Sequence, residues 1–166
     1  VHHLAGHLHA VFLHRAGEPQ PKGPAWPHVA LAVSGGHTAL YRVEAPGRVH
    51  TLANTRDDAA GEAFDKVSRM LGLGYPGGPV VERLAKGGDA EAYTFTAPRF
   101  KDGGLDFSFS GLKTAVLTVL KKHGDTLPDD AVRAHILASF QKAAVDQLVH
   151  RTTAAAKEYE VKDVVL

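Results

Sequence analysis

Four histidines stand close together near the start of the chain, at His2, His3, His7 and His9. If this segment is helical, the Cβ atoms of His3 and His7 lie about 5–6 Å apart on one face of the helix. Two imidazoles in that arrangement can bind one divalent metal ion. Two ligands do not complete a tetrahedral or octahedral shell, so such a site needs a further ligand from another part of the protein. Solvated or buried histidines without a metal remain the alternative.

The spacing His-x-x-x-His also occurs in zinc proteases, which gives a second functional hypothesis. In those enzymes a Glu directly follows the first His and acts as the general base. Here that position is Leu4. The sequence therefore argues against a metalloprotease, although the alternative stays open at this point.

Composition limits the classes of protein to consider. The 166 residues fit one domain of usual size, and a net charge of +1 predicts neither a general basic coat for nucleic acid nor a membrane-surface protein. The absence of Cys makes a reducing cytoplasm the simplest compartment. No apolar run approaches the ~20 residues of a membrane-spanning helix, and no signal peptide is visible. Among the basic residues, Lys101, Lys113, Lys121 and Lys122 are candidate contacts for a nucleic acid, on the ground of their charge alone.

The elements that would position these groups begin with a helix over 3–14 and a Pro-containing loop over 18–27. Residues 29–34 and 38–43 read as two strands of a hairpin, and 49–52 as a third strand of a meander. Between the first two lies Ser-Gly-Gly-His, whose glycines permit positive φ and a close approach of the backbone to a ligand.

A helical region is expected to follow. Asp57 and Asp58 are good N-caps for a helix that continues to about Leu71, in which Glu62 and Asp65 share one face. The alternative for this acidic pair is a solvated face that forms ion pairs with Lys66 and Arg69. A short helix over 79–85 follows two glycines, Gly77 and Gly78, which can form an anion-binding nest or a plain tight turn.

The second half of the chain predicts a strand over 105–109, a helix over 111–122 capped by Ser110, and a long helix over 129–158 capped by Asp129. Lys113 in a first helical turn opposes the helix dipole, so we expect it to have an acidic partner or to face solvent. The apolar stripe of the long helix comprises Val132, Ile136, Phe140, Ala143, Val145 and Leu148.

A final strand is expected over 161–166. The chain starts at Val1 rather than Met and stops inside this apolar run, so we expect it to be part of a longer protein.

Several motifs occur in a fixed order, and together they are far more specific than any one alone. They are His-His-x-x-Gly-His at 2–7, Val-Ser-Gly-Gly-His-Thr at 33–38, Asp-Asp-Ala-Ala-Gly-Glu-Ala-Phe-Asp-Lys at 57–66, Tyr-Pro-Gly-Gly-Pro at 75–79 and Leu-Asp-Phe-Ser-Phe-Ser-Gly-Leu-Lys-Thr at 105–114. Over essentially its whole length the chain resembles the tRNA N6-adenosine threonylcarbamoyltransferase family, formerly described as O-sialoglycoprotein endopeptidase.

The resemblance implies an α/β fold, namely an actin-like ATPase (ASKHA, RNase H-like) lobe from a two-lobed protein of which this chain is a fragment. Residues 1–28 would form a helix and linker from the inter-lobe region. Residues 29–166 would form the truncated lobe, with a helical insertion at about 57–125.

The resemblance also implies transfer of the threonylcarbamoyl group from threonylcarbamoyl-AMP to N6 of the adenosine 3′ of the anticodon in tRNA, which gives t6A. Implied partners are tRNA, a related inactive paralogue subunit and a small ATPase. This fragment alone is expected to be inactive, and a noncatalytic module that binds a nucleotide or a partner remains an alternative.

The family's functional positions can be carried over to matching residues. One divalent metal ion per subunit, iron or zinc, would be bound by His3 and His7, with an Asp beyond Leu166 as a third ligand. Threonylcarbamoyl-AMP or an ATP-type nucleotide would contact Ala32, Val33, Ser34, Gly35, Gly36, Asp65 and Gly78. Many members carry Glu where this chain has Ala5, so any role of that carboxylate is missing here or supplied by another group.

Overall fold

The computed structural model describes residues 3–19, 22–98, 100, 103–124 and 126–166. His2 and Lys101 of the sequence-based hypotheses therefore lie outside the described residues. The elements run in the order α1 (His3–His9), a 3₁₀ turn η1 (Ala10–Phe12), β1 (His28–Val33), β2 (Thr38–Ala45), β3 (Arg48–Asn54), α2 (Ala60–Met70), α3 (Gly77–Ala85), α4 (Ser110–Lys122), α5 (Asp130–Glu158) and β4 (Val164–Val165). The expected α/β class is confirmed.

The strands form one sheet in the order β3-β2-β1-β4. β1 pairs with β2 and β2 with β3 in antiparallel register, which confirms the predicted meander. β4 lies parallel to β1 through the pairs Val29–Val164 and Ala30–Val165. The last strand is therefore present, but it is shorter than the predicted range 161–166.

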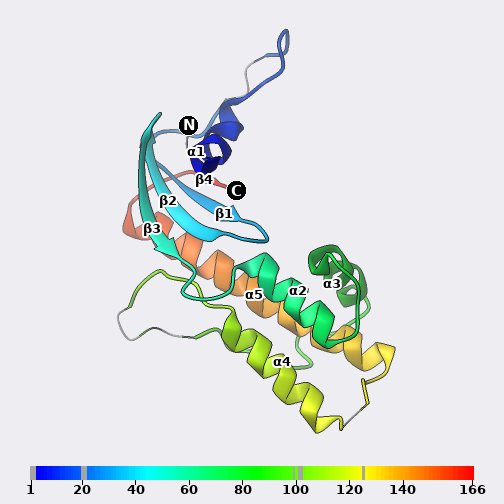
Figure 1. The fold of residues 1–166 in the computed structure, drawn as a ribbon. Coiled ribbons are helices and arrows are strands. Elements are labelled where there is room, and N and C mark those ends of the chain that lie inside the picture. The colour runs from blue at the N-terminus through cyan, green and yellow to red at the C-terminus, as the bar shows by residue number, and fades with distance from the viewer. Residues whose placement is uncertain (1–2, 20–21, 99, 101–102, 125) are drawn as a thin grey trace.

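The sheet carries apolar side chains on both faces because successive residues of a strand point to opposite sides. On one face Leu8 of α1 packs with Ala30, Tyr41 and their neighbours. On the other, Leu31 and Leu40 join the larger core formed with the helices. In Figure 1 α1 lies above the sheet, whereas the long α5 runs below it.

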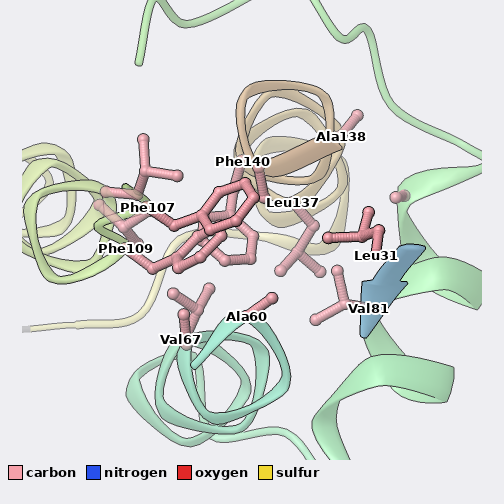
Figure 2. Packing of buried hydrophobic residues seen from close by; sticks show 14 of the residues in the cluster. Leu31, Ala60, Val67, Val81, Phe107, Phe109, Leu137, Ala138 and Phe140 are labelled. Carbon is pink, nitrogen blue, oxygen red and sulfur yellow. The ribbon is translucent and has the colours of Figure 1, made fainter. Parts of the chain in front are cut away.

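The larger core is centred on three fully buried phenylalanines. Phe107 and Phe109 lie beside Phe140 of α5, with Val67 of α2 close by (Figure 2). The strand predicted over 105–109 is wrong, since only an isolated bridge joins Phe107 to Thr55. Ser108 is buried as well: its backbone N–H donates to Gln147 Oε1, and Gln147 Nε2 donates to its carbonyl, both at 2.9 Å. The side chain of Gln147 therefore satisfies the backbone N–H and carbonyl of Ser108, as a neighbouring strand would in a sheet.

Helix boundaries also differ from those predicted. The first helix ends at His9 and continues only as the 3₁₀ turn η1, α2 begins at Ala60 rather than at Asp57, and α3 begins at Gly77 rather than at 79. Ser110 is the first residue of α4 rather than its cap. Asp129 is confirmed as a cap, since its carboxylate accepts from Val132 N at 2.8 Å.

The apolar stripe predicted for α5 is correct at Ile136 and Phe140, which are fully buried, but wrong at Val145, which is 44% exposed. Among the described residues no helix combines the length and the apolar character that crossing a membrane requires.

A candidate cavity for metal and substrate

A cavity of about 510 Å³ lies between α1 and the β1–β2 end of the sheet. Its wall combines α1, β1, the loop that follows β1, and the end of the chain. The lining residues are His3, Leu4, His7, Leu8, Ala10, Val11, Ala30, Leu31, Ala32, Val33, Ser34, His37, Val165 and Leu166. His3 and His7 therefore line the same cavity as Ser34, the first residue of the Ser-Gly-Gly loop.

The side chains of His3 and His7 face each other across one turn of α1. Their Nε2 atoms are 3.1 Å apart, and their rings are nearly perpendicular, with centroids 4.5 Å apart. Two nitrogen ligands about 2.0–2.1 Å from a tetrahedral ion would be separated by about 3.3 Å. The spacing therefore fits two ligands of one metal ion.

The pair does not by itself make a metal site. Within the described ranges no group of three or more His, Cys, Asp or Glu side chains is arranged to hold a metal. His9 does not join the pair, because it is partly buried and its Nδ1 lies 2.7 Å from the carbonyl oxygen of Ala5 in its own helix. His9 therefore agrees with the alternative given above, a partly buried histidine without a metal.

The loop over 34–37 is shaped by one hydroxyl. Ser34 Oγ accepts hydrogen bonds from Gly36 N at 3.3 Å and from His37 N at 3.0 Å. Ser34 N in turn donates to His37 O at 2.8 Å, which closes the turn. Gly35 and Gly36 do not adopt the positive φ that glycine permits at these positions.

Close packing against this loop depends on another glycine, Gly61. A Cβ added at Gly61, in the first turn of α2, would lie 2.7 Å from Gly35 Cα and 2.8 Å from Ser34 O. The loop also caps α2: Gly61 N donates to Ser34 O at 3.2 Å, and Ala60 N donates to Thr38 Oγ1 at 2.8 Å. The N-terminus of α2 is therefore fixed against the substrate loop suggested by sequence.

Asp65 and Gly78 are not among the described residues that line the cavity. Asp65 Oδ1 accepts a hydrogen bond from Gly77 N at 2.6 Å, which joins the start of α3 to α2. A Cβ at Gly77 would meet Phe64 O at 2.5 Å, so this glycine permits helix packing, and its N–H is used by Asp65 rather than left open as an anion nest. Asp65 follows Gly61 by four residues, about 6 Å along the helix axis.

The two acidic residues expected to share a face of α2 have different partners. Lys66 Nζ donates to Asp58 Oδ1 at 2.6 Å and forms an ion pair with Glu62 at 2.8 Å. These hydrogen bonds raise the pKa of Lys66. Lys113 of α4 lies 4.0 Å from Asp58 Oδ2, so the acidic partner expected for it is present. Glu62 therefore forms the ion pair with Lys66 that was the alternative for this acidic pair, whereas Asp65 accepts a hydrogen bond from the backbone N–H of Gly77.

Asp57 has a structural role that the sequence interpretation missed. Its carboxylate accepts hydrogen bonds from the hydroxyl and the N–H of Ser110, from Phe109 N, and from Ser108 Oγ. Partial burial raises the pKa of Asp57, but these hydrogen bonds together outweigh it and hold the pKa below its usual value. The pattern Ser108-x-Ser110 before a helix was the available signal, yet it did not reveal which distant acid would cap that helix.

Of the lysines considered for tRNA contact, Lys121 and Lys122 are exposed at the end of α4, whereas Lys113 is held near Asp58.

His37 lines the cavity as well, although the sequence interpretation assigned it no role.

Comparisons with known proteins agree with the sequence resemblance. Residues 1–166 match the family model described as tRNA N6-adenosine threonylcarbamoyltransferase. A protein of that name from Paracidovorax citrulli (strain AAC00-1) is 54% identical over 166 residues, which are 100% of this chain and 45% of the relative. Relatives of the same name come from Sorangium cellulosum (strain So ce56) and Geobacter sulfurreducens (strain ATCC 51573 / DSM 12127 / PCA), and each is 51% identical over all of this chain. The matched region is 48% of the first relative and 46% of the second. The chain therefore spans about half the length of the curated relatives it matches.

Proposed function

This chain belongs to the tRNA N6-adenosine threonylcarbamoyltransferase family, and we propose on that premise that the complete protein transfers a threonylcarbamoyl group from threonylcarbamoyl-AMP to N6 of the adenosine 3′ of the anticodon in tRNA. The observation that carries the proposal is the shared cavity, in which the His3–His7 pair and Ser34 of the loop line one hollow. The α/β architecture is consistent with the actin-like ATPase fold of the family.

We propose that His3 and His7 hold one divalent metal ion, iron or zinc. The 3.1 Å separation of their Nε2 atoms supports this, and the exposure of both side chains leaves the pair open to further ligands. When bound, such an ion supplies Lewis-acid polarisation of phosphate or carbonyl oxygens. The remaining ligand would come from outside the described residues.

The substrate loop is proposed to comprise Ala32, Val33, Ser34, Gly35 and Gly36. A Cβ at Gly35 or Gly36 would have no described atom within 4 Å other than those of its chain neighbours, so a ligand can approach this backbone without displacing other groups. Asp65, about one helical turn along α2 from Gly61, and Gly78 of α3 are proposed as further contacts. One oxygen of Asp65 is used by Gly77 N, and carboxylates have further lone pairs with which to accept from a ribose or threonyl hydroxyl.

The wider assignments rest on the family. We propose tRNA, a related inactive paralogue and a small ATPase as partners, and the cytoplasm as the compartment. Residues 1–28 are proposed as the inter-lobe helix and linker, and 29–166 as part of an actin-like lobe with an insertion at about 57–125. Because the chain spans about half of its relatives' length, we expect it to be inactive alone. A noncatalytic module that binds a nucleotide or a partner is the alternative for the isolated chain.

The decisive experiment uses the complete protein with its partner subunits, threonylcarbamoyl-AMP and tRNA that lacks the modification. Digestion of the tRNA and mass spectrometry of the nucleosides should detect t6A. Absence of t6A with all components present would contradict the proposal. Cleavage of a glycoprotein that requires His3 and His7 would instead favour the metalloprotease, for which Leu4 supplies no general base.

A further inference from the structure

We propose that His37 is the general base that removes the proton from the attacking amine of the tRNA adenosine. The inference rests on the proposed function and deepens it, because it assigns a proton acceptor to the same cavity. Four polar side chains line that cavity among the residues that the structure describes: His3, His7, Ser34 and His37. The remaining lining residues are apolar.

The first three polar groups already have other uses. The Nε2 atoms of His3 and His7 face each other at 3.1 Å, and a metal-bound nitrogen has no lone pair left for a proton. Ser34 Oγ accepts two backbone N–H bonds that shape the loop. No described side chain or backbone group forms a hydrogen bond with the His37 ring, and no metal-binding group of three includes it.

The backbone of His37 is fixed even though its side chain is exposed. Its N–H donates to Ser34 Oγ at 3.0 Å, and its carbonyl accepts from Ser34 N at 2.8 Å. The next residue, Thr38, begins β2 and caps α2 through its hydroxyl. The exposed imidazole, which lines the cavity, is therefore carried by a hydrogen-bonded turn, and acid–base catalysis requires preorganisation of this kind.

The chemistry needs such a base. The N6 nitrogen attacks the carbamoyl carbonyl carbon, so a C–N bond forms and the C–O bond to the phosphate breaks. AMP leaves with the electron pair of that bond, and N6 must lose one proton to give the neutral urea of the product. A neutral imidazole has one acceptor nitrogen and can take that proton. Among the described residues, the other titratable side chains that line the cavity are His3 and His7.

The test compares wild type with His37→Gln and His37→Gly in the complete protein with its partners, under single-turnover conditions with threonylcarbamoyl-AMP and tRNA. We expect both variants to form t6A about 100-fold more slowly or worse, and added imidazole to restore the rate of His37→Gly but not that of His37→Gln. Metal content and affinity for threonylcarbamoyl-AMP should match wild type. His123→Gln, at the exposed end of α4, is the matched control and should keep the wild-type rate.

The outcomes separate the two proposals. If wild type forms no t6A, the proposed function fails. If wild type forms t6A and His37→Gln is equally fast, only the inference about His37 is overturned. It is also overturned if the variants lose metal or nucleotide binding in proportion to the rate, or if imidazole does not rescue His37→Gly.

Discussion

The carboxylate of Asp57 accepts a hydrogen bond from the hydroxyl of Ser110 at 2.7 Å, across 53 residues of sequence. Asp57 lies just before α2, and Ser110 is the first residue of α4. With Phe109 N also bound to the same carboxylate, Asp57 caps α4 from outside that helix. One acidic side chain thus ties α4 to the segment that leads from the sheet to α2.

Replacing Asp57 with Ala should loosen α4. Loss of a helix cap costs about 1 kcal/mol, which corresponds to a roughly fivefold larger equilibrium constant for opening of the capped turn. Hydrogen exchange of the α4 amides in the complete protein measures this directly. The exposed Asp130→Ala is a matched control and should leave α4 exchange unchanged; equal exchange in Asp57→Ala and wild type would refute the capping role.

The same contact predicts a dependence on acid. Because the folded-state pKa of Asp57 lies below its ordinary value of 3.8, its stabilising effect is complete above that value and is lost as the pH falls through the folded pKa. The difference in thermal melting temperature between wild type and Asp57→Asn should be constant near neutrality and shrink below about pH 4. A difference that stays constant down to pH 2 would contradict this.

A second pH effect comes from His28, the fully buried first residue of β1. Burial lowers its pKa below 6.5, and the hydrogen bond to Ala25 O and the nearby Asp163 only partly offset this. The contribution of neutral His28 is therefore complete above pH 6.5 and is lost as the pH falls through the lower folded pKa. Melting temperatures of wild type should fall on acidification from pH 7 to 5 more than those of His28→Phe. The exposed His50→Phe should behave like wild type.

Metal content tests the histidine pair. His3→Ala combined with His7→Ala should lower bound iron or zinc by at least about tenfold, since even loss of a group that only supports a ligand costs 10–100-fold in affinity. Elemental analysis of the purified complete protein gives the readout, with His123→Ala as control. A double variant that keeps its full metal content would eliminate the proposed site.

Packing of α2 on the loop predicts a steric effect at Gly61. An added methyl group would lie 2.7 Å from Gly35 Cα, so Gly61→Ala must push the helix away from the loop. Overpacking of this kind costs about 1–3 kcal/mol, and we also expect weaker binding of threonylcarbamoyl-AMP. Calorimetric titration and thermal melting provide the measurements. Gly111→Ala, with no described atom within 4 Å of its added carbon, should melt at or above the wild-type temperature.

The sequence by itself determined the meander, the long helix with its Asp129 cap, and the pairing of His3 with His7, because these depend on periodicity and on neighbours within one turn. It also carried the family resemblance. Tertiary structure alone decided that Asp57 caps α4 rather than α2, that Gln147 holds Ser108, and that Asp65 binds Gly77 N. Hydrogen-bonding groups can be satisfied by partners far away in sequence, and local spacing does not specify which partner comes into reach. The cavity that His37 lines together with His3 and His7 is decided in the same way, by how α1 packs on the sheet.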